Sequence, residues 1–148
     1  MENVCILTPE VDYLGPLFNE GSQGLALPID VTQVNQFTCW SDRLAWKNAY
    51  QLEEILMLDS RFVLCQKSAF DTQQSWDTHY QSFYFSMMDY FLQARQNALR
   101  SWVRKDVFIH APPLQVPANT LDQHYFETKW GKPLEQITLK TLMKNPLN

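Results

Sequence analysis

The sequence of 148 residues has only four glycines and three cysteines. The glycines form neither a G-x-x-x-x-G-K-[ST] nor a G-x-G-x-x-G phosphate-binding loop, which excludes the nucleotide-binding classes that depend on these loops. The cysteines lie far apart and form no C-x-x-C pair, as is typical of reduced thiols in a cytoplasm. We therefore expect neither a disulfide framework nor a cysteine-based zinc site.

Long hydrophobic runs are also missing. The longest uninterrupted apolar segments span a few residues, whereas a membrane-spanning helix needs about 20. The first ten residues, MENVCILTPE, carry acids where a secretory signal carries bases, and their apolar stretch is too short for a signal core. We expect a cytoplasmic protein without a membrane partner.

Catalytic and metal-binding patterns are equally scarce. The histidines His79, His110 and His124 each stand alone, whereas a zinc site usually takes at least two ligands from a close pair. Ser22 is bounded by glycines but lacks the apolar strand that precedes a nucleophile elbow. We expect no metal, no cofactor and no enzymatic activity. One alternative is an enzyme whose site is assembled from scattered Cys, His and acidic residues, such as Cys65 with His110.

The composition that remains is that of a globular protein. Hydrophobic residues make up 45% of the chain, charged residues 19%, and 20 residues are aromatic, so the chain can bury enough apolar surface to fold. Its length fits one domain over residues 1–148.

The most informative segment is the run from Trp76 to Val103, which contains no Gly or Pro. Its apolar side chains recur at steps of three or four, the spacing of an amphipathic helix. The pattern predicts one long central helix over 76–103, about 40 Å in length at about 1.5 Å per residue. The residues expected to be deeply buried are Tyr80, Phe83, Met87, Phe91 and Leu99.

Shorter patterns surround this helix, and turn residues, N-cap residues and apolar periodicity indicate their bounds. The predicted strands are residues 3–8, 25–34, 61–66 and 107–110, residues 13–28 are a predicted loop, and the predicted helices are 42–57, 121–130 and a closing helix from Pro133. Gly131 stands where a helix-terminating glycine belongs. The sum is an α+β fold, helix-dominated, with a small sheet.

Charge is distributed unevenly along the chain. The net charge is −4, but residues 1–60 carry nine acids against two bases, while residues 61–105 carry six bases against three acids. Such asymmetry either steers a charged partner or is neutralised within the fold. Glu53 and Glu54, neighbours on the predicted 42–57 helix, are the acidic candidates for a docking surface.

The aromatic residues of the central helix suggest a function. One domain can bury most of these rings but not all, and Tyr, Trp, Met and Arg are enriched in protein interfaces. We expect an exposed ridge of Phe85, Met88 and Leu92, with Tyr90 beside it. The favoured interpretation is a small non-enzymatic protein that binds another protein, as an accessory subunit, adaptor or inhibitor-type partner of a larger cytoplasmic complex. Its partner-binding residues would be Glu53, Glu54, Phe85 and Tyr90.

A basic stretch near the end of the predicted helix supports a second interpretation. Arg100 and Arg104 would share a helix face, where their guanidinium groups could contact phosphate. The alternative is therefore a nucleic-acid-associated subunit, although a sequence pI of about 5.3 is low for one. The residues that would contact nucleic acid or phosphate are Arg95, Arg100, Arg104 and Lys105.

Overall fold

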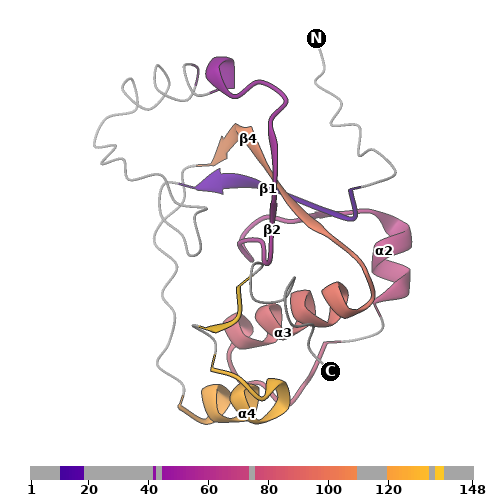
Figure 1. The fold of residues 1–148 in the computed structure, drawn as a ribbon, viewed down its shortest axis with the longest axis vertical. Coiled ribbons are helices and arrows are strands. Elements are labelled where there is room, and N and C mark those ends of the chain that lie inside the picture. Colours follow the sequence, from indigo (N-terminus) through magenta and orange to yellow (C-terminus); the bar gives the residue numbers. More distant parts are fainter. Residues whose placement is uncertain are drawn as a thin grey trace.

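The computed structural model describes residues 11–18, 42, 45–73, 76–109, 120–133 and 136–138, and the structural statements below concern this part of the chain. Its elements are, in order, β1 (Tyr13–Phe18), β2 (Leu52–Ile55), β3 (Leu64–Cys65), α2 (Lys67–Thr72), α3 (Phe83–Gln96), β4 (Ser101–Ile109) and α4 (Thr120–Trp130). The four strands form one small mixed sheet beside the helices (Figure 1), which confirms the predicted α+β class.

The sheet has the strand order β2-β4-β1-β3. The long strand β4 runs parallel to β1 and antiparallel to β2, and β3 is antiparallel to β1. Leu58 packs closely against Gly15 of β1. A Cβ added at Gly15 would lie only 2.6 Å from Leu58 Cδ2, so the missing side chain makes room for the leucine. Pro16 is the last residue before the β1–β4 register shifts, a position that tolerates a residue without a backbone N–H.

Helix α3 lies between the sheet and α4 (Figure 1). On one side, the ring of Tyr13 from β1 meets Phe91 edge to face at 5.6 Å between centroids. On the other side, Phe85 lies 5.9 Å from Phe126 of α4. Because α3 is covered from two directions, its buried residues extend around most of its circumference rather than along one stripe. They are Phe85, Met87, Met88, Asp89, Tyr90, Phe91, Leu92 and Ala94.

The predicted helix over 76–103 is wrong at both ends. At the C-terminal end, Ala98 has a φ of 60° and turns the chain into β4, which gains pairing with both β1 and β2. At the N-terminal end, the Asp77 carboxylate accepts the backbone N–H of His79. Such local side-chain bonds compete with helix formation, and the helix begins only at Phe83.

Two further predictions are wrong for related reasons. The 42–57 helix is contradicted at its C-terminal end, where residues 52–55 form β2 because they pair with β4. The 13–28 loop is contradicted at its N-terminal end, where residues 13–18 form β1. In both cases pairing with a distant strand outweighs the local signal, whether helical spacing or a Gly-Pro pair.

The other local predictions agree with the structure more closely. The 121–130 helix is confirmed as α4, and Gly131 ends it with a φ of 65°. The 107–110 strand is part of β4 up to Ile109, and the 61–66 strand is reduced to Leu64–Cys65. The predicted strands at 3–8 and 25–34, and most of the closing helix, lie outside the described residues.

Candidate functional site

The segment of residues 76–82, here called the 76–82 loop, presents aromatic rings to solvent just before α3. Trp76 is 40% exposed and Phe83, the first residue of α3, is 61% exposed, so the prediction that Phe83 is buried is wrong. The side chain of His79 is 75% exposed. We call Trp76, His79 and Phe83 together the aromatic surface.

Stacking fixes the Trp76 ring in place. Its centroid lies 5.9 Å from that of Phe83 and 4.5 Å from that of Tyr90, and both pairs are nearly parallel. Phe83 and Tyr90 are seven residues apart on α3, which corresponds to about 10.5 Å along a helix axis. The Trp76 ring therefore fits between them, and Phe83 is the outer, exposed ring of the stack.

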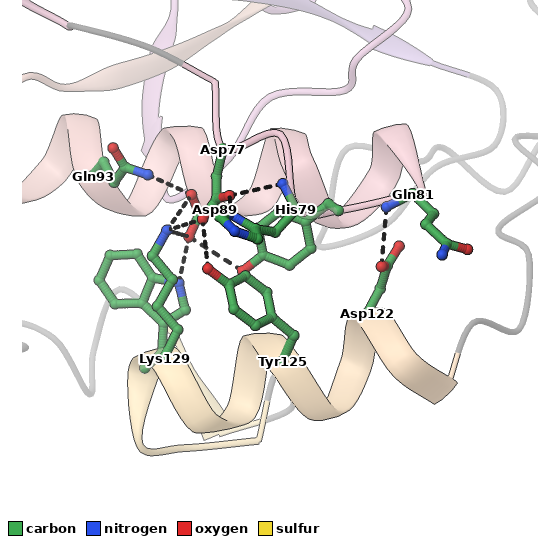
Figure 2. A network of polar contacts seen from close by, with 10 residues as sticks. Asp77, His79, Gln81, Asp89, Gln93, Asp122, Tyr125 and Lys129 are labelled. Carbon is green, nitrogen blue, oxygen red and sulfur yellow. Dashed lines mark hydrogen bonds and ion pairs between the residues drawn. The ribbon is translucent and has the colours of Figure 1, made fainter.

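Asp77 ties the 76–82 loop to α4 (Figure 2). Its carboxylate accepts the backbone N–H of His79 at 3.0 Å and lies 2.8 Å from that residue's Nδ1. It also accepts the hydroxyl of Tyr125 at 3.0 Å and the ammonium of Lys129 at 2.6 Å. Burial opposes ionisation of Asp77, but hydrogen bonds from Lys129, His79 and Tyr125 outweigh it and hold the pKa of this carboxyl below its usual range.

Lys129 shares its ammonium between Asp77 and a second carboxylate, Asp89 of α3 (Figure 2). The Lys129 Nζ lies 2.9 Å from Asp89, which is fully buried. Burial disfavours the ammonium, but the two carboxylates outweigh burial and raise the pKa of Lys129. We call Asp77, Asp89 and Lys129 the Lys129 cluster.

Neutral donors satisfy the remaining acceptor sites of Asp89. Trp130 Nε1 donates to it at 2.8 Å, the hydroxyl of Tyr80 at 3.3 Å, and the amide of Gln93 also contacts it. Burial, together with the neighbouring negative charges, raises the pKa of Tyr80, so this hydroxyl stays protonated and can donate. The buried charge is thus fully hydrogen-bonded, as buried ionic groups require.

A third carboxylate holds the end of the 76–82 loop. Asp122 of α4, only 3% exposed, accepts the backbone N–H groups of Gln81 at 3.0 Å and Ser82 at 2.6 Å. Ser82 precedes α3 but makes no side-chain cap hydrogen bond of its own. Asp122 supplies the carboxylate that favours a helix N-terminus, and it does so from another helix.

The site offers limited acid–base chemistry. Asp77 orients the His79 ring in the way that the acidic member of a catalytic triad orients the histidine base. Among the described residues, however, no side chain hydrogen-bonds to the other ring nitrogen of His79. Within the same residues, no group of three or more His, Cys, Asp and Glu side chains could hold a metal ion. What the geometry provides is an imidazole oriented by Asp77 and packed 5.5 Å, between ring centroids, from Tyr125. It lies in the same loop as the exposed Trp76, three residues after it.

The predicted aromatic ridge is not on the surface. Phe85 and Tyr90 are each 6% exposed, and Met88 and Leu92 are buried with them. Phe85 packs against α4, and the hydroxyl of Tyr90 lies 3.2 Å from that of Tyr13 on β1. The prediction that this ridge is exposed is wrong, because both faces of α3 that carry it are covered.

Both predicted acidic residues, and three of the four predicted basic residues, form ion pairs within the fold instead of separate surfaces. Glu54 forms an ion pair with Arg95, Glu53 with Lys105, and Arg104 with Asp106. Arg100 and Arg104 do not share a helix face, since Arg104 lies on β4 and Arg100 just before it. The uneven charge of the sequence is at these positions neutralised within the fold.

Sequence reasoning missed the polar residues that organise the 76–82 loop. Asp89 carried a usable signal, because it is the single charge within the apolar run FYFSMMDYFLQA, and a buried position would require partners for it. Nothing in the spacing of Asp77, Asp122 and Lys129 indicates that the fold brings them together.

Comparison with known proteins gives no relative: no protein-family model, no curated protein and no solved structure matches this chain. Within the described residues, no helix combines the length and apolar character needed to cross a membrane.

Proposed function

We propose that this protein acts by binding another protein through the aromatic surface. The observation that carries the proposal is the exposure of Phe83, at 61%, as the outer ring of an ordered stack with Trp76 and Tyr90. Aromatic side chains dominate the binding energy of many protein interfaces. A ring that is already held in place loses little conformational freedom on binding, which favours affinity.

The support beneath these rings fits the same role. Binding residues commonly lie on loops that a rigid scaffold positions, and the 76–82 loop is fixed by carboxylates of its own and of α4. The protein would serve as an accessory subunit or adaptor in a cytoplasmic complex. The unpaired thiol of Cys65 is compatible with that reducing location.

The nucleic-acid alternative has less support. Three of its four candidate residues, Arg95, Arg104 and Lys105, contact acidic side chains, so their charge is already compensated. A nucleic-acid surface needs cations that remain available to phosphate.

Site-specific photo-crosslinking tests the proposal. A photoreactive residue replaces Gln81, which is exposed in the 76–82 loop, or Gln96, which is exposed at the other end of α3. After irradiation in the native cell extract, we expect one stoichiometric protein adduct from position 81 and none from position 96. Mass spectrometry identifies the adduct, and nuclease treatment shows whether it contains nucleic acid.

A matched pair of variants tests whether the aromatic surface causes this capture. Phe83→Ala should abolish the adduct from position 81, whereas Phe70→Ala on α2 should leave it unchanged. The two phenylalanines have nearly equal exposure, 61% and 60%, so both variants remove the same group at a similar structural cost. Equal capture by both variants, or a nuclease-sensitive adduct, would contradict the proposal.

A further inference from the structure

Three backbone amides of the 76–82 loop are held by side-chain carboxylates. The N–H of His79 donates to Asp77 at 3.0 Å, and the N–H groups of Gln81 and Ser82 donate to Asp122 at 3.0 and 2.6 Å. Asp122 lies on α4, 40 residues beyond Ser82 in the sequence. The shape of the loop therefore depends on a distant helix as well as on its own Asp77.

Neither carboxylate belongs to the aromatic surface. Asp122 is 3% exposed and the Asp77 side chain 11% exposed, so both are too buried to be main contacts for a partner. Asp77 is in turn fixed through Lys129, which also binds Asp89 of α3. The loop is thus fastened to both helices beneath it.

We infer that Asp77 and Asp122 are positioning residues of the binding site: they set the backbone between Trp76 and Phe83 so that the aromatic surface is presented in one arrangement. The three exposed side chains sit on two rigid anchors, the stack on α3 and the turn at Asp77. Losing Asp77 removes the turn, and losing Asp122 frees the end of the loop before α3, while every exposed ring stays present. The inference rests on the proposed function only for its effect on binding.

Amide hydrogen exchange followed by NMR tests the structural part without any ligand. In Asp122→Ala the amides of Gln81 and Ser82 should exchange faster, and in Asp77→Ala the amide of His79 should do so, because each loses its acceptor. Amides of β1 and β4 should accelerate only by the factor that the measured loss in free energy of unfolding accounts for, and the loop amides should accelerate by more. The matched control is Asp71→Ala on α2, which removes an exposed carboxylate paired with Lys67 and should change none of these rates.

The isosteric Asp122→Asn provides a second route if the alanine variant does not fold. Asparagine keeps the size of the side chain but has one acceptor oxygen, so exchange should rise at one of the two amides. Unchanged exchange at residues 79, 81 and 82 in every variant would overturn the inference. Acceleration in the sheet equal to that of the loop amides would also overturn it, because the carboxylates would then act only through the stability of the whole fold.

Binding is then measured with the protein that the position-81 crosslink identifies. If the loop holds its binding arrangement only a tenth of the time, apparent affinity should fall about tenfold, although Trp76, His79 and Phe83 are intact. Faster exchange with unchanged affinity would refute the positioning role and leave the proposed function standing. Should Phe83→Ala bind normally, the proposed function fails, whereas the exchange result still reports whether the carboxylates order the loop.

Discussion

Two groups of charged residues hold this protein together in different ways. In the Lys129 cluster, one ammonium serves two carboxylates, one of them fully buried, and neutral donors complete the coordination. On β2, each acid has its own cation: Glu54 pairs with Arg95 of α3 and Glu53 with Lys105 of β4. These side chains are partly exposed, from 18% for Glu54 to 55% for Glu53.

The difference shows which charges determine shape. A partly exposed pair can lose one member because water solvates the other, so its contribution to stability is small. A buried carboxylate has no such substitute, and the penalty for leaving it without a partner is several times larger. We therefore expect substitutions in the Lys129 cluster to disturb the fold far more than those along the sheet.

The largest effect is expected for Lys129→Met. This change removes the ammonium that Asp77 and the fully buried Asp89 share, so the free energy of unfolding should fall by about 3 to 5 kcal/mol. Chemical denaturation measures it, with Lys67→Met, at an exposed i,i+4 pair on α2, as the control. A loss below about 1 kcal/mol, the range of surface pairs, would place the cluster in the same class as the sheet pairs.

The pH dependence of stability gives an intermediate effect. The pKa of Asp77 is lowered by folding, so its stabilisation is present above the unfolded value of about 3.9 and is lost as pH falls through the folded value. Wild type should exceed Asp77→Asn in stability by about 1.5 to 3 kcal/mol at pH 7, the range for charged hydrogen bonds. Below about pH 4 the gap should narrow. If the stability difference between wild type and Asp77→Asn stayed constant down to pH 2, ionisation of Asp77 would not contribute to the free energy of unfolding.

The smallest effect is expected at the sheet. Glu54→Gln and Arg95→Gln, alone and combined, form a double-mutant cycle whose coupling should be about 0.2 to 1 kcal/mol and should shrink as salt is added. For Glu53 with Lys105, which is more exposed, the coupling should be smaller still. Coupling above about 2 kcal/mol in either cycle would remove the contrast between the two groups.

The sequence allowed the class of fold and the best-bounded helix to be predicted. Helix α4 has matching local signals at both ends, and Gly131 adopts the positive φ expected of a terminating glycine. The helical spacing from Trp76 to Val103 gave a wrong C-terminal end for the helix, because the start of β4 also contains apolar residues at compatible intervals. Pairing with β1 decides the conformation of β4. The spacing of residues within one segment contains no information on a partner strand that lies far away in the chain.

The candidate site was harder to predict because exposure depends on what covers α3. The prediction assumed a single apolar stripe, which made Phe83 buried and placed Phe85 and Tyr90 near the edge of the stripe. In the structure the sheet and α4 cover two faces of the helix and bury Phe85 and Tyr90. The carboxylates beneath the 76–82 loop come from three separate segments. Tertiary packing brings them together. Only Asp89, as a single charge in an apolar segment, gave a signal in the sequence that it would need buried partners.

The placement of β4 has a consequence for how the chain folds during synthesis. Among the described strands, β2 pairs only with β4, and β1 pairs in parallel with it, Tyr13 opposite Ser101. At about 5 to 20 residues per second of translation, β1 leaves the ribosome several seconds before its main partner exists. Parallel pairing over such a separation is intrinsically slow. The nascent chain therefore carries the apolar β1 segment without its central neighbour until β4 emerges. A chaperone that binds exposed apolar segments would act mainly during this interval.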